Sequence, residues 1–147
     1  MTKNIRMGSM DWRDPAWTGP FYPADMPQEW RLTYYASQFN CVFLEANIWR
    51  NDVLSGLDQW CDDVHSQFVF LLEDGENSTP PEALAQKAIM VGSLDPRILW
   101  FDRNSDLKQL AAQIRSGASD REIFLISRDG NLAQMERVGT LLELMGL

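Results

Sequence analysis

The sequence is poor in the residues on which most enzymatic and metal-binding motifs depend. It contains one histidine and two cysteines, and neither a G-x-G-x-x-G nor a G-x-x-x-x-G-K-[ST] pattern occurs. Cys41 and Cys61 are not in a C-x-x-C spacing, so a disulfide framework and a zinc knuckle are not expected, and both thiols are predicted to be reduced. His65 precedes a predicted strand, at the end opposite to a ligand face, which gives nucleophilic catalysis no support.

Positive charge and long apolar runs are also scarce. The net charge is −8 and no cluster of Lys and Arg relieves it, which argues against binding to nucleic acids and to anionic membranes. No apolar run approaches the roughly 20 residues that cross a bilayer, and the N-terminus lacks the apolar stretch of a signal peptide. We therefore expect a cytoplasmic protein.

Strand-like and helix-like segments alternate along the whole chain, which predicts one α/β domain over residues 1–147. The strand-like runs are nearly continuous in apolar residues, as in a parallel sheet that is covered on both faces. The predicted strands are 5–10, 41–49, 67–72, 97–101 and 122–127. The predicted helices are 27–39, 54–64, 80–92, 105–117 and 131–146. Five βα units with a mainly parallel five-stranded sheet and flanking helices follow, and the polar stretch 73–81 is interpreted as a loop rather than a domain boundary.

The N-terminal half carries a recognisable pattern. Gly8, Trp12 and Trp17-x-Gly-x-Phe-Tyr-Pro are followed by Tyr34-Tyr-Ala-x-x-Phe, by the strand run 41–50, by Trp60 and by Phe68-x-Phe. This pattern resembles the YecE-like proteins, domain of unknown function 72, and it is specific through about residue 72. The resemblance implies a TIM-type barrel, which has eight βα units. Since only five units are predicted here, the chain resembles a truncated barrel, either an open sheet with helices on both faces or a partial barrel whose edges pair with another chain.

The polar positions of the family pattern are altered in this sequence. Phe43 stands where the family has a glutamate, Glu45 where it has an asparagine, and Glu73 where a lysine is common. The typical E-F-R-H run has become 126–129, with Arg128 as its arginine. The family's chemistry is therefore not transferred to this chain.

The first predicted loop, Gly8–Pro23, contains several aromatic residues and follows the first strand, where βα folds form ligand sites. One interpretation is that Trp12 and Trp17, with Phe21 and Tyr22, plug the end of the sheet as a small core. The other is that Trp12 and Trp17 line a ligand pocket.

Charged groups follow the predicted strands, and among them Asp11, Glu45, Asn47 and Arg128 are the candidate ligand-binding residues beside the two tryptophans. Carboxylates that converge there would suit Mg²⁺ or Mn²⁺, and arginines would suit a phosphate or a carboxylate. Glu45 and Asn47 lie within an apolar predicted strand, and a buried Glu45 would need a cation such as Arg13 or Arg128. The alternative is that these residues cap helices and solvate loops.

Two functions from different classes remain open. The first is a non-catalytic binding or interaction protein on a truncated barrel scaffold, with no cofactor. Its partner would be another protein, a second copy at an open sheet edge, or a small anionic ligand. The alternative is a metal- or phosphate-dependent hydrolase or lyase, with Asp11, Glu45, Asp102 and Arg128 at the strand ends. A phosphoacceptor receiver domain fits less well, because Arg128 stands where that fold needs a lysine.

Overall fold

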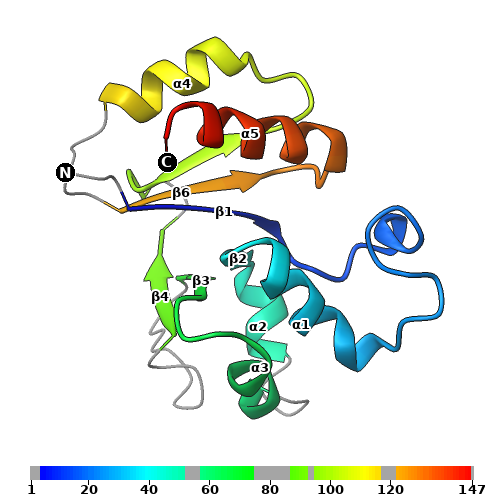
Figure 1. Cartoon of the computed structure of the whole chain (residues 1–147). Coiled ribbons are helices and arrows are strands. Elements are labelled where there is room, and N and C mark those ends of the chain that lie inside the picture. The colour runs from blue at the N-terminus through cyan, green and yellow to red at the C-terminus, as the bar shows by residue number, and fades with distance from the viewer. Residues whose placement is uncertain (1–3, 52–56, 75–86, 93–94, 117–121, 147) are drawn as a thin grey trace.

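The computed structural model describes residues 4–51, 57–74, 87–92, 95–116 and 122–146 (Figure 1). Within these residues the chain forms six strands and five α-helices. The strands are β1 (Asn4–Met10), β2 (Cys41–Leu44), β3 (Val69–Glu73), β4 (Ala88–Val91), β5 (Ile98–Phe101) and β6 (Glu122–Ser127). The helices are α1 (Gln28–Gln38), α2 (Ala46–Asn51), α3 (Leu57–Asp63), α4 (Leu107–Ser116) and α5 (Leu132–Leu144), with a 3₁₀ turn at Pro15–Trp17.

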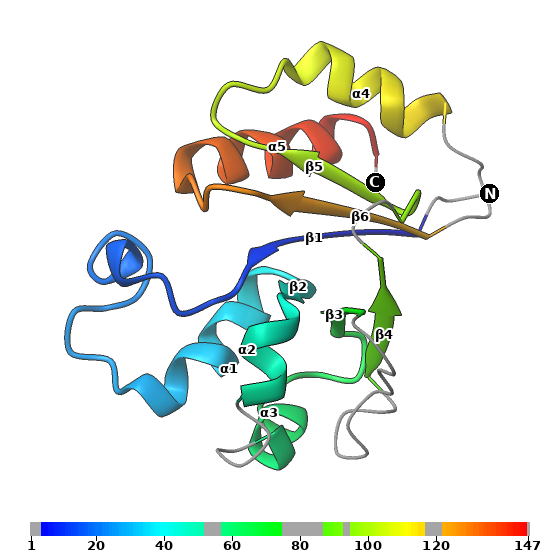
Figure 2. The same ribbon diagram turned by 180° about the vertical axis from the view of Figure 1, so that it is seen from behind.

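All six described strands are parallel and form one curled sheet in the order β4-β3-β2-β1-β6-β5, a half-barrel (Figures 1 and 2). The last strand pairs with the first, in register from Asn4 opposite Glu122 to Ser9 opposite Ser127. In a closed parallel barrel the last strand also meets the first. The break in this barrel therefore lies in the middle of the chain, between β4 and β5, which residues 92–97 connect.

The expected five-stranded sheet is wrong by one strand, because β4 lies within the segment 80–92 that the sequence predicts as a helix. Residues 80–86 lie outside the described residues, but Ala88–Val91 pair with β3, with Phe70 opposite Ala88 and Glu73 opposite Val91. Ile89 and Val91 have high strand propensity, and their pairing with β3, most of whose residues are buried, decides the conformation of Ala88–Val91.

The predicted strand 41–49 is also too long, since β2 ends at Leu44 and α2 begins at Ala46. The Glu45 carbonyl accepts hydrogen bonds from the backbone N–H of Ile48 and Trp49, and the Glu73 carboxylate accepts one from Ala46. These bonds start a short helix within a run of strand-forming residues. The other four strands and four helices are confirmed, with shifted ends.

Side-chain caps mark the starts of two helices, α4 and α5. Asn131 accepts a hydrogen bond from the Gln134 N–H at the start of α5, and Asp106 accepts one from Lys108 at the start of α4. Each of these caps immediately precedes the first residue of its helix.

The two faces of the sheet form two separate cores, one with the helices and one between the side chains of the strands themselves. The convex face and the helices form the larger core, to which β6 contributes Ile123 and Leu125. The concave face is filled by the strands themselves, with Phe124 and Ile126 of the same strand and an edge-to-face contact between Phe43 and Trp100 at 5.0 Å. Because the helices that the structure describes contribute only to the first core, the fold is the partial barrel rather than a sheet with helices on both faces.

The concave core contains Cys41, which is fully buried, and burial raises the pKa of its thiol. Cys41 and Cys61 are both free thiols, as the sequence predicts. Among the described helices, none combines the length and the apolar composition that a membrane crossing requires. Pairing of the sheet edges β4 and β5 with another chain stays a prediction.

Candidate functional site

The connection between β1 and α1, residues 11–27, is called the aromatic loop here. Trp12, Trp17 and Tyr22 are buried within it and belong to the convex core. Trp17 stacks on Tyr35 of α1 with ring centroids 6.2 Å apart, and the Tyr22 hydroxyl donates to the Trp12 carbonyl at 2.6 Å. The loop is therefore folded as a small core at the end of β1.

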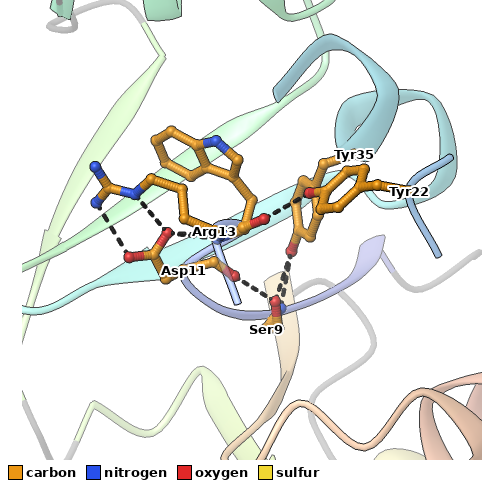
Figure 3. A network of polar contacts seen from close by, with 6 residues as sticks. Ser9, Asp11, Arg13, Tyr22 and Tyr35 are labelled. Atoms are coloured by element: carbon orange, nitrogen blue, oxygen red, sulfur yellow. Dashed lines mark hydrogen bonds and ion pairs between the residues drawn. The ribbon is translucent and has the colours of Figure 1, made fainter. Parts of the chain in front are cut away.

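A network of hydrogen bonds ties this loop to the end of β1 (Figure 3). The Tyr35 hydroxyl accepts from the Ser9 N–H at 2.9 Å and donates to the Cys41 carbonyl at 2.7 Å. Ser9 Oγ in turn donates to the Asp11 carbonyl at 2.7 Å. Burial raises the pKa of the Tyr35 hydroxyl, so at neutral pH this group keeps the proton that it donates.

Asp11 is held at the same place by its own neighbours. Its φ of 64° is in the left-handed region, and its carboxylate accepts from the backbone N–H groups of Trp12 and Arg13. The Arg13 guanidinium adds two hydrogen bonds of 2.9 and 3.0 Å, one to each carboxylate oxygen (Figure 3). The same guanidinium lies over the rings of Trp12 and Trp60, at 4.8 and 5.6 Å from their centroids. The charge of Asp11 is thus neutralised inside the network.

A second region lies where β5 and β6 end. A cleft of about 620 Å³, called the strand-end cleft, opens there between the loops that follow these strands and the wall of the aromatic loop. Its charged and amide-bearing lining residues are Asp14, Asp102, Arg103, Asn104, Arg128, Asp129 and Asn131, and Trp17 contributes to the wall.

The carboxylates of this cleft are bonded to the protein itself. Asp14 accepts from the Ala16 N–H at 2.9 Å, and Asp102 accepts from the Asn104 N–H at 2.8 Å. Asp129 accepts from the backbone N–H groups of Arg103 and Asn131 and from the Ser127 hydroxyl. Partial burial alone would raise the pKa of Asp129, but these hydrogen bonds outweigh it and lower the pKa. The carboxylates therefore act as caps of the loops.

Unlike the carboxylates, the arginine side chains of the cleft form no hydrogen bonds with other described residues. The Arg128 guanidinium lies over the Trp100 ring, 4.4 Å from its centroid, and Arg103 is exposed. Among the residues that the structure describes, no carboxylate forms an ion pair with Arg103 or Arg128. The cleft therefore presents two cationic groups whose hydrogen-bond donors are not used within the described structure.

Trp17 connects the two regions. Its indole N–H donates to the Gly130 carbonyl at 2.9 Å, across from the aromatic loop to the turn between β6 and α5. Gly130 has a φ of 65°, and an added Cβ would lie 3.1 Å from a carboxylate oxygen of Asp14 and 3.4 Å from the Trp17 ring. Glycine at this position lets the turn pack against the tryptophan, so that Trp17 and this turn together form the wall of the cleft.

The structure brings only part of the predicted site together. Trp17 and Arg128 line the strand-end cleft, whereas Asp11 is paired with Arg13 and Trp12 lines a separate hollow of about 340 Å³ between α1 and α3. Glu45 and Asn47 are exposed at the start of α2. The expected burial of Glu45 is not found, because β2 ends one residue before it, and Glu45 needs no cation. Ligand binding by these residues stays a prediction.

Sequence reasoning missed Asp14, Asn131 and Gly130 as parts of the cleft, and it missed the contact of Arg128 with Trp100. The Asp129-Gly130 pair before a helical segment is a turn signal that points to a tight connection there. Nothing in the sequence signals that Asp14 of the first loop meets this turn, because the contact depends on β6 lying beside β1.

The described part of the chain also bears on two further kinds of site, a metal site and a histidine-based catalytic site. No group of three His, Cys, Asp or Glu side chains that could hold a metal ion occurs among the described residues. His65 is exposed before β3, and its Nδ1 accepts a hydrogen bond from the Gln67 N–H at 3.1 Å.

Comparison with known proteins gives one result. Residues 6–92 match the sequence model of a protein family described as "Protein of unknown function DUF72". This match covers more than half of the chain, and it includes most of β1, the aromatic loop and the segment up to the end of β4. No curated protein and no solved structure matches the chain.

Proposed function

The chain belongs to the DUF72 family, and we propose that it is a non-catalytic binding protein that holds a small anionic ligand, a phosphate or a carboxylate, in the strand-end cleft. The observation that carries the proposal is the pair of arginines, Arg103 and Arg128, which line this cleft without a carboxylate partner among the described residues. Guanidinium groups bind phosphate and carboxylate through parallel hydrogen bonds.

The position of the cleft supports the same proposal. Parallel βα folds bind ligands beyond the carboxyl ends of their strands, and the cleft lies beyond β5 and β6. The stacking of Arg128 on Trp100 orders its side chain before a ligand arrives, which lowers the entropy lost on binding.

The carboxylates support a binding role rather than acid–base chemistry. Asp102 and Asp129 accept hydrogen bonds from backbone N–H groups, and Asp11 is paired with Arg13 outside the cleft lining. A general base needs a free carboxylate within reach of a substrate proton. In the proposed protein these carboxylates shape the loops, and the arginines contact the ligand.

The test is a titration of the purified protein with inorganic phosphate, pyrophosphate and citrate, followed by calorimetry and thermal unfolding. Arg128→Met and Arg103→Met are each expected to weaken the affinity about ten- to a hundredfold, because one hydrogen bond to a charged group contributes roughly 1.5–3 kcal/mol. The thermal midpoint of the ligand-free variants should stay close to that of the wild type.

Arg115→Met is the matched control, because Arg115 is an exposed arginine at the end of α4 and does not line the cleft. It should bind all three anions as the wild type does. Absence of binding up to about 10 mM of each anion, or an equal loss in Arg115→Met, would reject the proposal.

A further inference from the structure

A groove runs along the outer side of β1 between α1 and α5. Two adjoining hollows of about 450 and 490 Å³ form it, and both are lined by Met7, Phe39 and Gly139. One hollow reaches Phe21 at the carboxyl end of β1, and the other reaches Ile5 and His65 at its amino end. Figures 1 and 2 show α1 and α5 on either side of β1.

The groove is long enough for an elongated ligand such as a helical segment, rather than for a compact small molecule. It follows β1, which has seven residues and is therefore roughly 20 Å long. About 14 residues of α-helix span the same distance. The lining includes the partly exposed apolar side chains of Ile5, Met7 and Phe39, beside polar side chains such as that of Gln38.

A peptide strand cannot bind here through its backbone. β1 is paired with β2 on one side and with β6 on the other, so its backbone hydrogen bonds face neighbouring strands. An occupant must therefore be recognised through side chains alone, which is how a groove binds an amphipathic helix.

The charge of the groove specifies the helix further. Of the residues that line it, Glu136 and Glu143 of α5 carry negative charge and no Lys or Arg is present. Neither glutamate forms an ion pair within the described part of the chain. They are separated by two helical turns, about 10 Å along α5, so cationic side chains two turns apart on a partner helix would match them.

Gly139 lies between these glutamates and keeps the groove open. A Cβ at this position would meet only Met7 Cε, at 3.6 Å, which is an ordinary van der Waals contact. The fold itself therefore does not require glycine, although glycine inside a helix costs roughly 0.5–1 kcal/mol relative to alanine. Its absence of a side chain leaves room for a neighbouring helix.

We infer that this groove is a docking site for an amphipathic helix of another protein, with an apolar stripe flanked by Lys or Arg. The inference is independent of the anion site, because the two surfaces share only Pro20 and Leu132 at their margins. The helix lies along β1 with its apolar side chains on Met7 and Phe39 and its cationic side chains against Glu136 and Glu143.

The probe is a synthetic peptide of about 14 residues with leucines on one helical face and lysines on the other. Binding is measured by calorimetry, and the site is located by amide chemical shifts in the NMR spectrum. The shifts should concentrate at Met7, Phe39 and Gly139. The same peptide with glutamates in place of lysines should bind at least tenfold more weakly.

Gly139→Leu fills the groove, and Glu136→Lys/Glu143→Lys reverses its charge at two exposed positions, so that the second variant tests the site even where the first alters α5. Each is expected to weaken the lysine peptide at least tenfold. Glu29→Lys/Asp62→Lys is the control, since both residues are exposed and lie outside the groove. It makes the same change in net charge and should alter the affinity less than threefold.

Three results would overturn the inference. The first is equal weakening by the control, which would indicate attraction to the net charge alone. The second is a set of shifts that concentrates elsewhere, for example at the strand-end cleft. The third is a dimer in sedimentation experiments that Gly139→Leu dissociates, which would make a second copy of this chain the occupant.

Discussion

The aromatic loop and the strand-end cleft lie at the same end of the half-barrel, yet they use charged residues in opposite ways. In the aromatic loop, Asp11 and Arg13 neutralise each other, and Trp12, Trp17 and Tyr22 are buried. In the cleft, the carboxylates accept hydrogen bonds from the backbone, and Arg103 and Arg128 are left without carboxylate partners in the described structure.

The difference shows that, at one end of a βα fold, some charged residues stabilise the loops while others remain available to bind a ligand. A region whose polar groups all form hydrogen bonds within the protein has few donors and acceptors available to a ligand, and it contributes to the stability of the fold. A region whose charges are unequally matched is less favourable for stability and is the better candidate for binding. Substitutions in the first region should change the free energy of unfolding, and those in the second should change affinity.

The largest effect is expected at the base of the aromatic loop. In Gly8→Ala the new Cβ would lie 1.9 Å from the Cys41 carbonyl oxygen and 2.7 Å from the Tyr35 hydroxyl. Because β1 and β2 would have to separate, we expect a loss of about 3 kcal/mol or more, or no folded protein. Urea denaturation monitored by tryptophan fluorescence measures the change.

Gly139→Ala is the control for that experiment, because a Cβ there meets only Met7 Cε at 3.6 Å. It should gain about 0.5–1 kcal/mol, as alanine replaces glycine within α5. An unchanged denaturation midpoint in Gly8→Ala would contradict the close packing of β1 on β2.

Tyr35→Phe should have the next largest effect. The substitution leaves the buried Ser9 N–H and the Cys41 carbonyl without the hydroxyl that both contact, and we expect a loss of about 2–4 kcal/mol. Tyr34→Phe, one residue earlier, removes a hydroxyl that forms no hydrogen bond among the described residues, so the free energy of unfolding should change by less than about 0.5 kcal/mol. Equal effects of the two substitutions would show that the network does not stabilise the loop.

A smaller effect distinguishes the arginines of the two regions. Arg13→Met removes a bidentate pair with Asp11 and the contacts with Trp12 and Trp60, and should cost about 1–2 kcal/mol, since both partners are partly exposed. Arg103→Met should stay within about 0.5 kcal/mol of the wild type. Thermal unfolding of both variants checks the order, and a reversed order would remove the distinction between the regions.

The smallest expected effect is the dependence of stability on acidic pH through Asp129. Hydrogen bonds hold the pKa of Asp129 below its usual value in the folded state, so its contribution to stability is complete above the unfolded pKa and is lost as pH falls through the lower folded pKa. Asp129→Asn should therefore lose less stability than the wild type between about pH 5 and pH 3. Denaturation at several pH values measures this, and parallel curves for the two proteins would contradict it.

Local sequence was sufficient for the elements whose pattern and packing agree. The strands 122–127 and 97–101 are apolar on both sides because the sheet packs on the helices and on its own concave core, and both were predicted. The pattern failed at Ala88–Val91 and after Leu44, where strand pairing with β3 and the hydrogen bond from the Ala46 N–H to the Glu73 carboxylate decide the outcome. Such contacts join residues that are not adjacent in the sequence.

The candidate site was predictable only in pieces. Trp17 and Arg128 could be proposed because each follows or flanks a predicted strand, but nothing local separates them from Glu45 and Asn47, which lie elsewhere. The cleft exists because β6 pairs with β1 and brings Gly130 against Trp17. That pairing joins residues that are far apart in the sequence, and it places Asp14 and Arg128 in the same cleft.

The sequence by itself determined the alternation of strands and helices and the family to which the chain belongs, because hydrophobic periodicity and residue spacing are local properties. Only the tertiary structure decided that the barrel is interrupted between β4 and β5, that the first loop forms a small core, which arginines have no carboxylate partner among the described residues, and where a groove opens along β1. These features depend on which distant segments pair, and the free energy of that pairing comes from the whole fold rather than from any one segment.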